Sequence, residues 1–180
     1  SGLGGALTFT ENDGATVIDG NLIVTDADDT ELQFSFINIS SGYNNSEDVL
    51  GFNNQNGIVG IWDAESGTMT LSGKASMTNY ETALESLTYN NTSDAPNTDS
   101  RTITWVVNDG IDNSLKALST VNVTAVNDLP ALGDAGDSLA FTENDGATVI
   151  DQNLSVTDVD DTNLESVTIT ISTGYVSRED

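Results

Sequence analysis

The sequence contains no cysteine, no histidine, 2 prolines and only 4 lysines and arginines in 180 residues. Without cysteine the chain forms no disulfide and offers no thiolate to a metal, and without histidine it lacks the usual imidazole ligand. Hydrolysis would then need a carboxylate pair in a cleft, and in so acidic a chain such pairs arise by chance. We therefore expect the chain not to be an enzyme. It also lacks any apolar run long enough to span a membrane.

Acidic residues are abundant, because 29 Asp and Glu give a formal net charge of −25. This charge repels nucleic acid and anionic lipid, so neither nucleic acid nor a membrane is an expected partner. Intrinsic disorder is the simple alternative, but 37% hydrophobic residues in regular alternation argue against it. Crowded carboxylates would destabilise a compact domain, so we expect cations in the folded structure. The remaining ligand types are oxygens, which favour hard cations such as Ca²⁺.

The chain contains an internal repeat. Residues 9–19 recur residue for residue as 141–151, and the acidic run 25–30 recurs with one substitution as 157–162, at the same offset of 132 residues. A period this long predicts that each repeat is a domain with its own core. We expect one complete repeat at 1–128, a linker at 129–136, and the N-terminal third of a second repeat at 137–180. The second copy would be either truncated or split by an insertion.

Alternating apolar residues predict an all-β fold. Comparison of the two copies places Ile37 and Ile39 in the core, because Phe34 and Phe36 become Ser166 and Thr168 while the isoleucines stay apolar. A capping-box spacing from Thr78 to Glu81 predicts one short helix at about residues 79–86. The expected class is an immunoglobulin-like antiparallel Greek-key sandwich in tandem repeats. Its predicted strands are residues 7–9, 16–18, 21–24, 32–39, 49–52, 60–62, 69–71, 87–89, 102–107 and 117–126, of which 60–62 and 69–71 form a hairpin.

Strand directions predict where carboxylates and amides converge. Glu11 ends the first strand and Asn127 and Asp128 follow the last, so these residues should lie at one end of the domain, together with Asp94 or Asp99 of the loop 90–100. The opposite end should hold Asp26, Asp28 and Asp109. The equivalent end of the second copy holds Asp158 and Asp160, so acidic groups of two repeats should meet at the junction between them, here called the seam.

Turn formation is the alternative explanation for such residues, since Asp and Asn bond their own backbone. This explanation suits Asn12, Asp13 and Asn108. It suits Glu11 poorly, because Glu is a poor turn residue and ends a predicted strand in both copies. The pattern Asp-x-Asp-Asp, kept while Ala27 becomes Val159, also favours ligands.

These motifs resemble the calcium motifs of cadherin repeats. The whole repeat is similar to the bacterial cadherin-like repeats strung through large secreted adhesins, many exported by the RTX route. The resemblance implies that seam calcium is bound by Glu11, Asn127, Asp128, Asp158 and Asp160. It implies that Asp26, Asp28 and Asp109 serve the seam with a preceding repeat. The chain departs from the cadherin pattern where an Asp-x-Glu pair is replaced by Asp94 or Asp99, and where the linker lacks its second Asn.

The expected function is that of a calcium-stiffened extender in an adhesin at the bacterial cell surface, acting in cell adhesion or biofilm attachment. Its partners would be neighbouring repeats of the same chain, joined through calcium, while other domains would bind any surface glycan or protein. The alternative is a carbohydrate-binding module of a secreted protein, in which Trp62, Tyr43 or Tyr175 stack on sugar rings. For Trp62 and Trp105, core packing is the simpler interpretation, since both lie in predicted strands.

Overall fold

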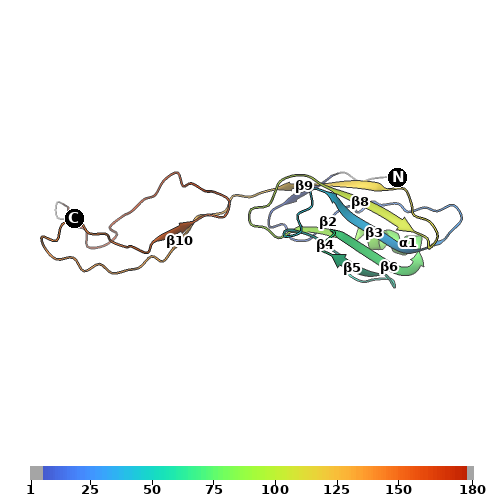
Figure 1. The fold of residues 1–180 in the computed structure, drawn as a ribbon, viewed down its shortest axis with the longest axis horizontal. Coiled ribbons are helices and arrows are strands. Elements are labelled where there is room, and N and C mark those ends of the chain that lie inside the picture. The colour runs from blue at the N-terminus through green and yellow to red at the C-terminus, as the bar shows by residue number, and fades with distance from the viewer. Residues whose placement is uncertain (1–5, 178–180) are drawn as a thin grey trace. The chain divides into compact units, whose positions relative to one another are not determined.

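The computed structural model describes residues 6–177 and divides the chain into two compact units, unit 1 (Ser1–Val126) and unit 2 (Asn127–Asp180). Each unit is considered by itself. Unit 1 is mostly β with one short helix (Figure 1), which confirms this part of the predicted class. No helix in residues 6–177 is long and apolar enough to cross a membrane.

Unit 1 contains a six-stranded sheet and a three-stranded sheet. The neighbours β1 and β9 run parallel, whereas every other adjacent pair is antiparallel. The prediction of a purely antiparallel arrangement is therefore wrong at this pair. A parallel pair needs a long crossover connection, and here most of the domain separates the two strands. In sheet order, the strands are β1 (Leu7–Thr10), β9 (Ala117–Thr124), β8 (Arg101–Asn108), β3 (Glu31–Ser41), β6 (Thr68–Ser76) and β5 (Val59–Asp63), then β2 (Thr16–Val17), β7 (Thr88–Asn91) and β4 (Asp48–Gly51).

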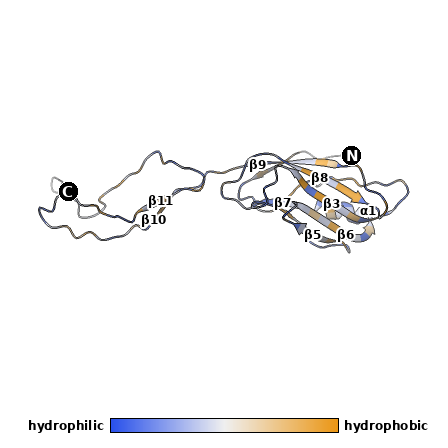
Figure 2. Cartoon of the chain, in the orientation of Figure 1, coloured by the Kyte–Doolittle hydropathy of each residue, from blue (hydrophilic) through white to orange (hydrophobic). Residues whose placement is uncertain are grey.

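The core of unit 1 follows the alternation in the sequence. Ile37 and Ile39 of β3 are buried, while Phe34 and Phe36 are 39% and 38% exposed, which confirms the predicted core face. The Phe9 ring on β1 meets the Tyr89 ring on β7 edge to face, with centroids 5.2 Å apart. This contact joins the two sheets. Hydrophobic stretches lie along strands of this unit, such as β8 (Figure 2).

The helix α1 (Met77–Glu85) begins about two residues before the predicted start. Its N-cap is Ser76, whose Oγ accepts a hydrogen bond from the Asn79 N–H at 3.3 Å. The predicted capping box is wrong, because Glu81 does not reach back to the helix start. Its Oε1 instead accepts from the backbone N–H of Val24 at 2.9 Å. Residues 21–24 were predicted as a strand. In the structure this segment is held to the helix by the Val24–Glu81 hydrogen bond and is not paired with a neighbouring strand.

In unit 2, β10 (Ala131–Gly133) pairs antiparallel with β11 (Ser155–Thr157). Residues 131–133 lie in the predicted linker 129–136, so the strand β10 was not predicted from the sequence. The apolar residues Val167, Ile169 and Ile171 are 75%, 82% and 55% exposed.

Candidate metal centres

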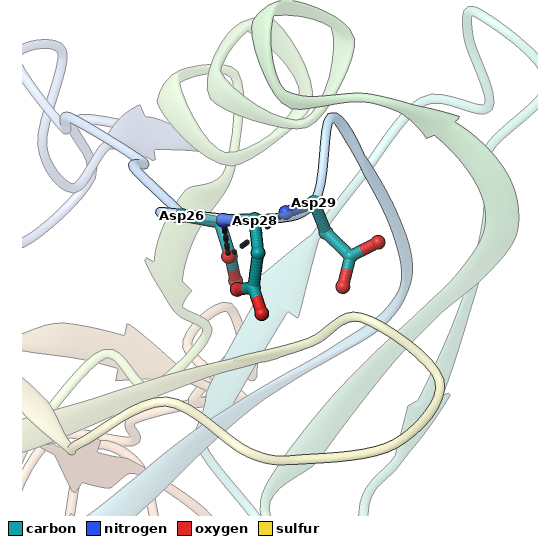
Figure 3. Close-up of side chains that lie close together, drawn as sticks. All are labelled: Asp26, Asp28 and Asp29. Carbon is teal, nitrogen blue, oxygen red and sulfur yellow. Dashed lines mark hydrogen bonds between the residues drawn. The ribbon is translucent and has the colours of Figure 1, made fainter.

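The first cluster of carboxylates lies in the loop between residues 24 and 31. The chain turns here because Oδ1 of Asp26 accepts the backbone N–H groups of Asp28 and Asp29, each at 3.1 Å. All three carboxylates point to the same side of the loop (Figure 3). One oxygen from each lies within 4.8 Å of the others. We call Asp26, Asp28 and Asp29 the first aspartate cluster.

The titration of this cluster reflects the crowding of its charges. Hydrogen bonds from the backbone N–H groups of Asp28 and Asp29 lower the pKa of Asp26. The pKa of Asp28 is raised, first by its side-chain hydrogen bond to Asp26 and then by repulsion from the charges of Asp26 and Asp29. The anion of Asp28 is therefore disfavoured beside its neighbours, and a bound divalent cation would offset that repulsion.

Asp109 follows β8 and shares a pocket of about 490 Å³ with Asp26. Its Oδ1 accepts the backbone N–H groups of Asp112 at 2.8 Å and Ile111 at 2.7 Å. These bonds lower its pKa, while the charge of Asp26 acts in the opposite direction. The structure thus brings Asp26, Asp28 and Asp109 to the same end of unit 1. Metal ligation by these three residues stays a prediction, and Asp29 was not among the predicted ligands.

The second aspartate cluster comprises Asp158, Asp160 and Asp161 of unit 2, whose carboxylate oxygens also lie within 4.8 Å of one another. Oδ1 of Asp158 accepts the backbone N–H groups of Asp160 at 3.3 Å and Asp161 at 3.0 Å, which repeats the geometry of the first cluster. The pKa of Asp158 is lowered, chiefly by the bond from Asp161. In the same unit, Asp128 donates its backbone N–H to Oδ2 of Asp160 at 3.2 Å. Asp128 and Asp160, both predicted ligands, therefore lie side by side.

Glu11 lies at the end of β1 and is 5% exposed. Its Oε2 accepts the backbone N–H of Val126 at 2.8 Å, which holds the residue immediately before Asn127. Its Oε1 is buried without a hydrogen-bond partner among residues 6–177. A buried carboxylate oxygen in this state is costly, and a cation is the kind of partner that would satisfy it. Asn127, in unit 2, is exposed, and its side-chain amide donates to the carbonyl of Asp128.

Backbone carbonyls of the loop 92–100 accept hydrogen bonds from a buried arginine. Asp94, the predicted ligand, is exposed, and ligation by it stays a prediction. Arg101 is fully buried, and its Nη1 donates to the backbone carbonyls of Asn97 and Asp99. On its other side, its guanidinium binds the Asp48 carboxylate. This pair was not predicted from the sequence. The available signal was an arginine directly before the predicted strand 102–107, in a chain with only four lysines and arginines.

The aromatic candidates for sugar stacking are partly used in packing. The Tyr43 ring meets the Trp62 ring edge to face at 6.2 Å between centroids, and the Tyr43 hydroxyl donates to the Ala64 carbonyl. Gly67, at φ +66°, lies so close to this ring that a Cβ would be 2.9 Å from it. Tyr43 therefore anchors the β5–β6 turn. Trp105 is 4% exposed, in keeping with core packing, whereas Tyr175 is 56% exposed.

Comparison with known proteins gives one distant similarity. A segment of 92 residues is 36% identical to part of halomucin from Haloquadratum walsbyi, a large surface protein. The match covers 48% of this chain and 1% of halomucin. No protein-family model matches the chain, and no solved structure matches it.

Proposed function

We propose that this chain is a tandem-repeat extender of a large extracellular surface protein, in which calcium ions bound at the ends of the repeats order the loops and stiffen the seams. The cadherin-like sandwich and an adhesive role belong to this proposal. The partial similarity to halomucin supports the surface location. It favours neither a bacterial source nor a particular adhesion partner.

The observation that carries the proposal is the repetition of the aspartate cluster. Asp26 and Asp158 stand 132 residues apart, and each accepts the backbone N–H groups two and three residues later. Three carboxylates within 4.8 Å of one another repel strongly in each copy. Turn formation alone requires only the first aspartate of each loop. The other two fit a hard cation that takes six to eight oxygen ligands.

The predicted ligands form separate groups in this proposal, according to their position in the repeat. Asp26, Asp28 and Asp109 hold a cation at one end of unit 1, and Asp158 and Asp160 hold one at the equivalent position of unit 2. Glu11, Asn127 and Asp128 supply the seam, since Glu11 binds the backbone of Val126 and Asp128 binds Asp160. Asp94 completes the predicted set.

Calcium titration of the 180-residue chain tests the proposal. We expect saturable binding by calorimetry in the range of about 10⁻⁴ to 10⁻³ M that suits extracellular modules. Bound calcium should raise the melting temperature, because a ligand that binds only the folded state stabilises it. Magnesium at equal ionic strength is the control for screening. Equal melting temperatures in calcium, magnesium and chelator would refute the calcium-dependent part of the function.

A further inference from the structure

The pocket beside the first aspartate cluster has an apolar floor. Leu22, Leu32, Leu84 and Trp105 line it and are at most 9% exposed. The segment 22–26 forms one wall, on which Leu22 and Val24 face inward while Ile23 is 67% exposed. Leu115, which also lines the pocket, is 94% exposed. The pocket has a volume of about 490 Å³, and its lining also includes the polar residues Asp109 and Asp112. It has room for an apolar peptide side chain against its apolar floor.

The wall also presents backbone groups for pairing. The Val24 N–H points to the helix and is taken by Glu81. In the equivalent strand β11 the chain is extended, and successive residues of an extended chain point their backbone groups to opposite sides. In that conformation Ile23 and Thr25 direct theirs away from the helix. Among residues 6–177, the backbone groups of Ile23 and Thr25 make no hydrogen bond. Such an edge is a template for strand addition.

Unit 2 shows what occupies this edge in the other copy. There β11, equivalent to residues 23–25, pairs with β10, and Leu132 lies opposite Val156. Subtracting the offset of 132 residues places Val24 opposite the position directly before Ser1 and Thr25 opposite the position before that. Residues directly opposite in an antiparallel pair have their side chains on the same face. A leucine opposite Val24 would therefore enter the pocket, because Val24 faces inward.

We propose that residues 23–25 and the adjoining pocket bind the linker of a preceding repeat, a segment with the sequence of residues 129–133, whose leucine equivalent to Leu132 fills the pocket over Trp105. Each linker then pairs with residues 23–25 and completes the core of the repeat that follows it. The inference rests on the tandem array of the proposed function but not on calcium. The seam is then held by strand pairing and apolar burial as well as by ions.

The test extends the 180-residue chain with a second copy of residues 125–132 placed directly before Ser1. Amide hydrogen exchange of Ile23 and Thr25 is compared with that of the unextended chain, in calcium and in chelator. We expect exchange at both amides to slow by about tenfold or more, as for amides that enter a stable ladder. Trp105 fluorescence should shift to shorter wavelength. The matched control carries Leu132→Asp in the extension only and should lose most of the protection and the shift.

The outcomes separate this inference from the proposed function. Protection in both calcium and chelator supports the linker site, even if calcium proves not to bind. Unchanged exchange in the extended chain overturns it, and equal protection by the Leu132→Asp control overturns the role of the pocket. Protection that appears in the unextended chain and grows with protein concentration would assign the edge to a second copy, and would also overturn it.

Discussion

Nη2 of Arg101 lies 3.1 Å from Oδ1 of Asp48, and both side chains are completely buried. The same Oδ1 accepts the Tyr89 hydroxyl at 2.6 Å and the Asn91 side-chain amide at 2.9 Å. One of the chain's four basic residues is thus used inside the domain. Among residues 6–177, ion pairs are made by Arg101 and by Lys74, and neither pair includes an aspartate of the two clusters. The hydrogen bond to Glu31 and, to a smaller extent, the charge of Asp29 raise the pKa of Lys74. A cation from solution is therefore the counter-charge that we expect for the clusters.

Asp48→Asn tests the buried pair. The substitution removes the fully buried counter-charge and leaves the arginine with Glu47 alone, whose Oε2 lies 3.9 Å from Nη2. We therefore expect it to lower the free energy of unfolding by about 3–5 kcal/mol. Urea unfolding followed by tryptophan fluorescence measures this, since both tryptophans lie in unit 1. Lys74→Ala is the control, because the Lys74–Glu31 pair is exposed and worth at most about 1 kcal/mol. Similar small losses in both variants would show that the buried pair is not an anchor of the fold.

Asp26→Asn and Asp158→Asn test the two aspartate clusters separately. Each substitution removes one charged ligand and keeps the side-chain oxygen that forms the turn, so each variant should lose about one calcium equivalent in calorimetry while staying folded. Asp160→Ala should act like Asp158→Asn and in addition remove the bond to Asp128.

Asp63→Asn is the matched control for these variants. Asp63 also accepts backbone and hydroxyl bonds within its loop, and its pKa is lowered by Ser66 and Glu65, but it belongs to neither cluster. Calcium stoichiometry should be unchanged in this variant. A loss as large as that of Asp26→Asn would mean that binding follows net charge, which contradicts discrete sites.

Much of unit 1 could be predicted from local pattern. Ile37 and Ile39 were identified because the two copies disagree about the other face of the strand, and most strand positions followed from alternation. The two copies also favoured metal ligands over turn residues in the Asp26 and Asp158 loops, and this stays a prediction. These features depend on residues that are neighbours in sequence, where periodicity carries the information.

What the sequence did not predict depends on distant contacts. Arg101 is buried because Asp48, 53 residues earlier, lies beside it. The parallel pairing of β1 with β9 likewise joins the two ends of the domain. The strand β10 is three residues long and shows no alternation, so only its pairing with β11 defines it. Glu81 matched a capping box by spacing, but the backbone of Val24 is its partner in the fold.

Ser76→Ala tests the observed start of the helix. Loss of the bond from the Asn79 N–H to the Ser76 hydroxyl should lower the free energy of unfolding by about 0.5–2 kcal/mol. Thr78→Ala is the control, because Thr78 is the N-cap that the sequence pattern had suggested and its side chain is exposed. Urea unfolding should show the larger loss for Ser76→Ala. The reverse order would restore the predicted capping box.

Tyr80→Phe tests how burial couples the fold to alkaline pH. Burial raises the pKa of Tyr80 from 10.0 to about 12, and its hydroxyl donates to the Gly73 carbonyl at 2.8 Å. The folded state therefore keeps the phenol neutral in a range where the unfolded chain ionises it. The stability that this provides is fully present below pH 10 and is lost as pH rises from 10.0 towards about 12.

At pH 8 the Tyr80→Phe variant should be less stable than the wild type by about 0.5–1.5 kcal/mol, the net value of one hydrogen bond. Urea unfolding at a series of pH values between 8 and 11 should show this gap shrinking above pH 10, because only the wild type loses the Tyr80 contribution. A gap that stays constant over the whole range would mean that Tyr80 ionises equally easily in both states.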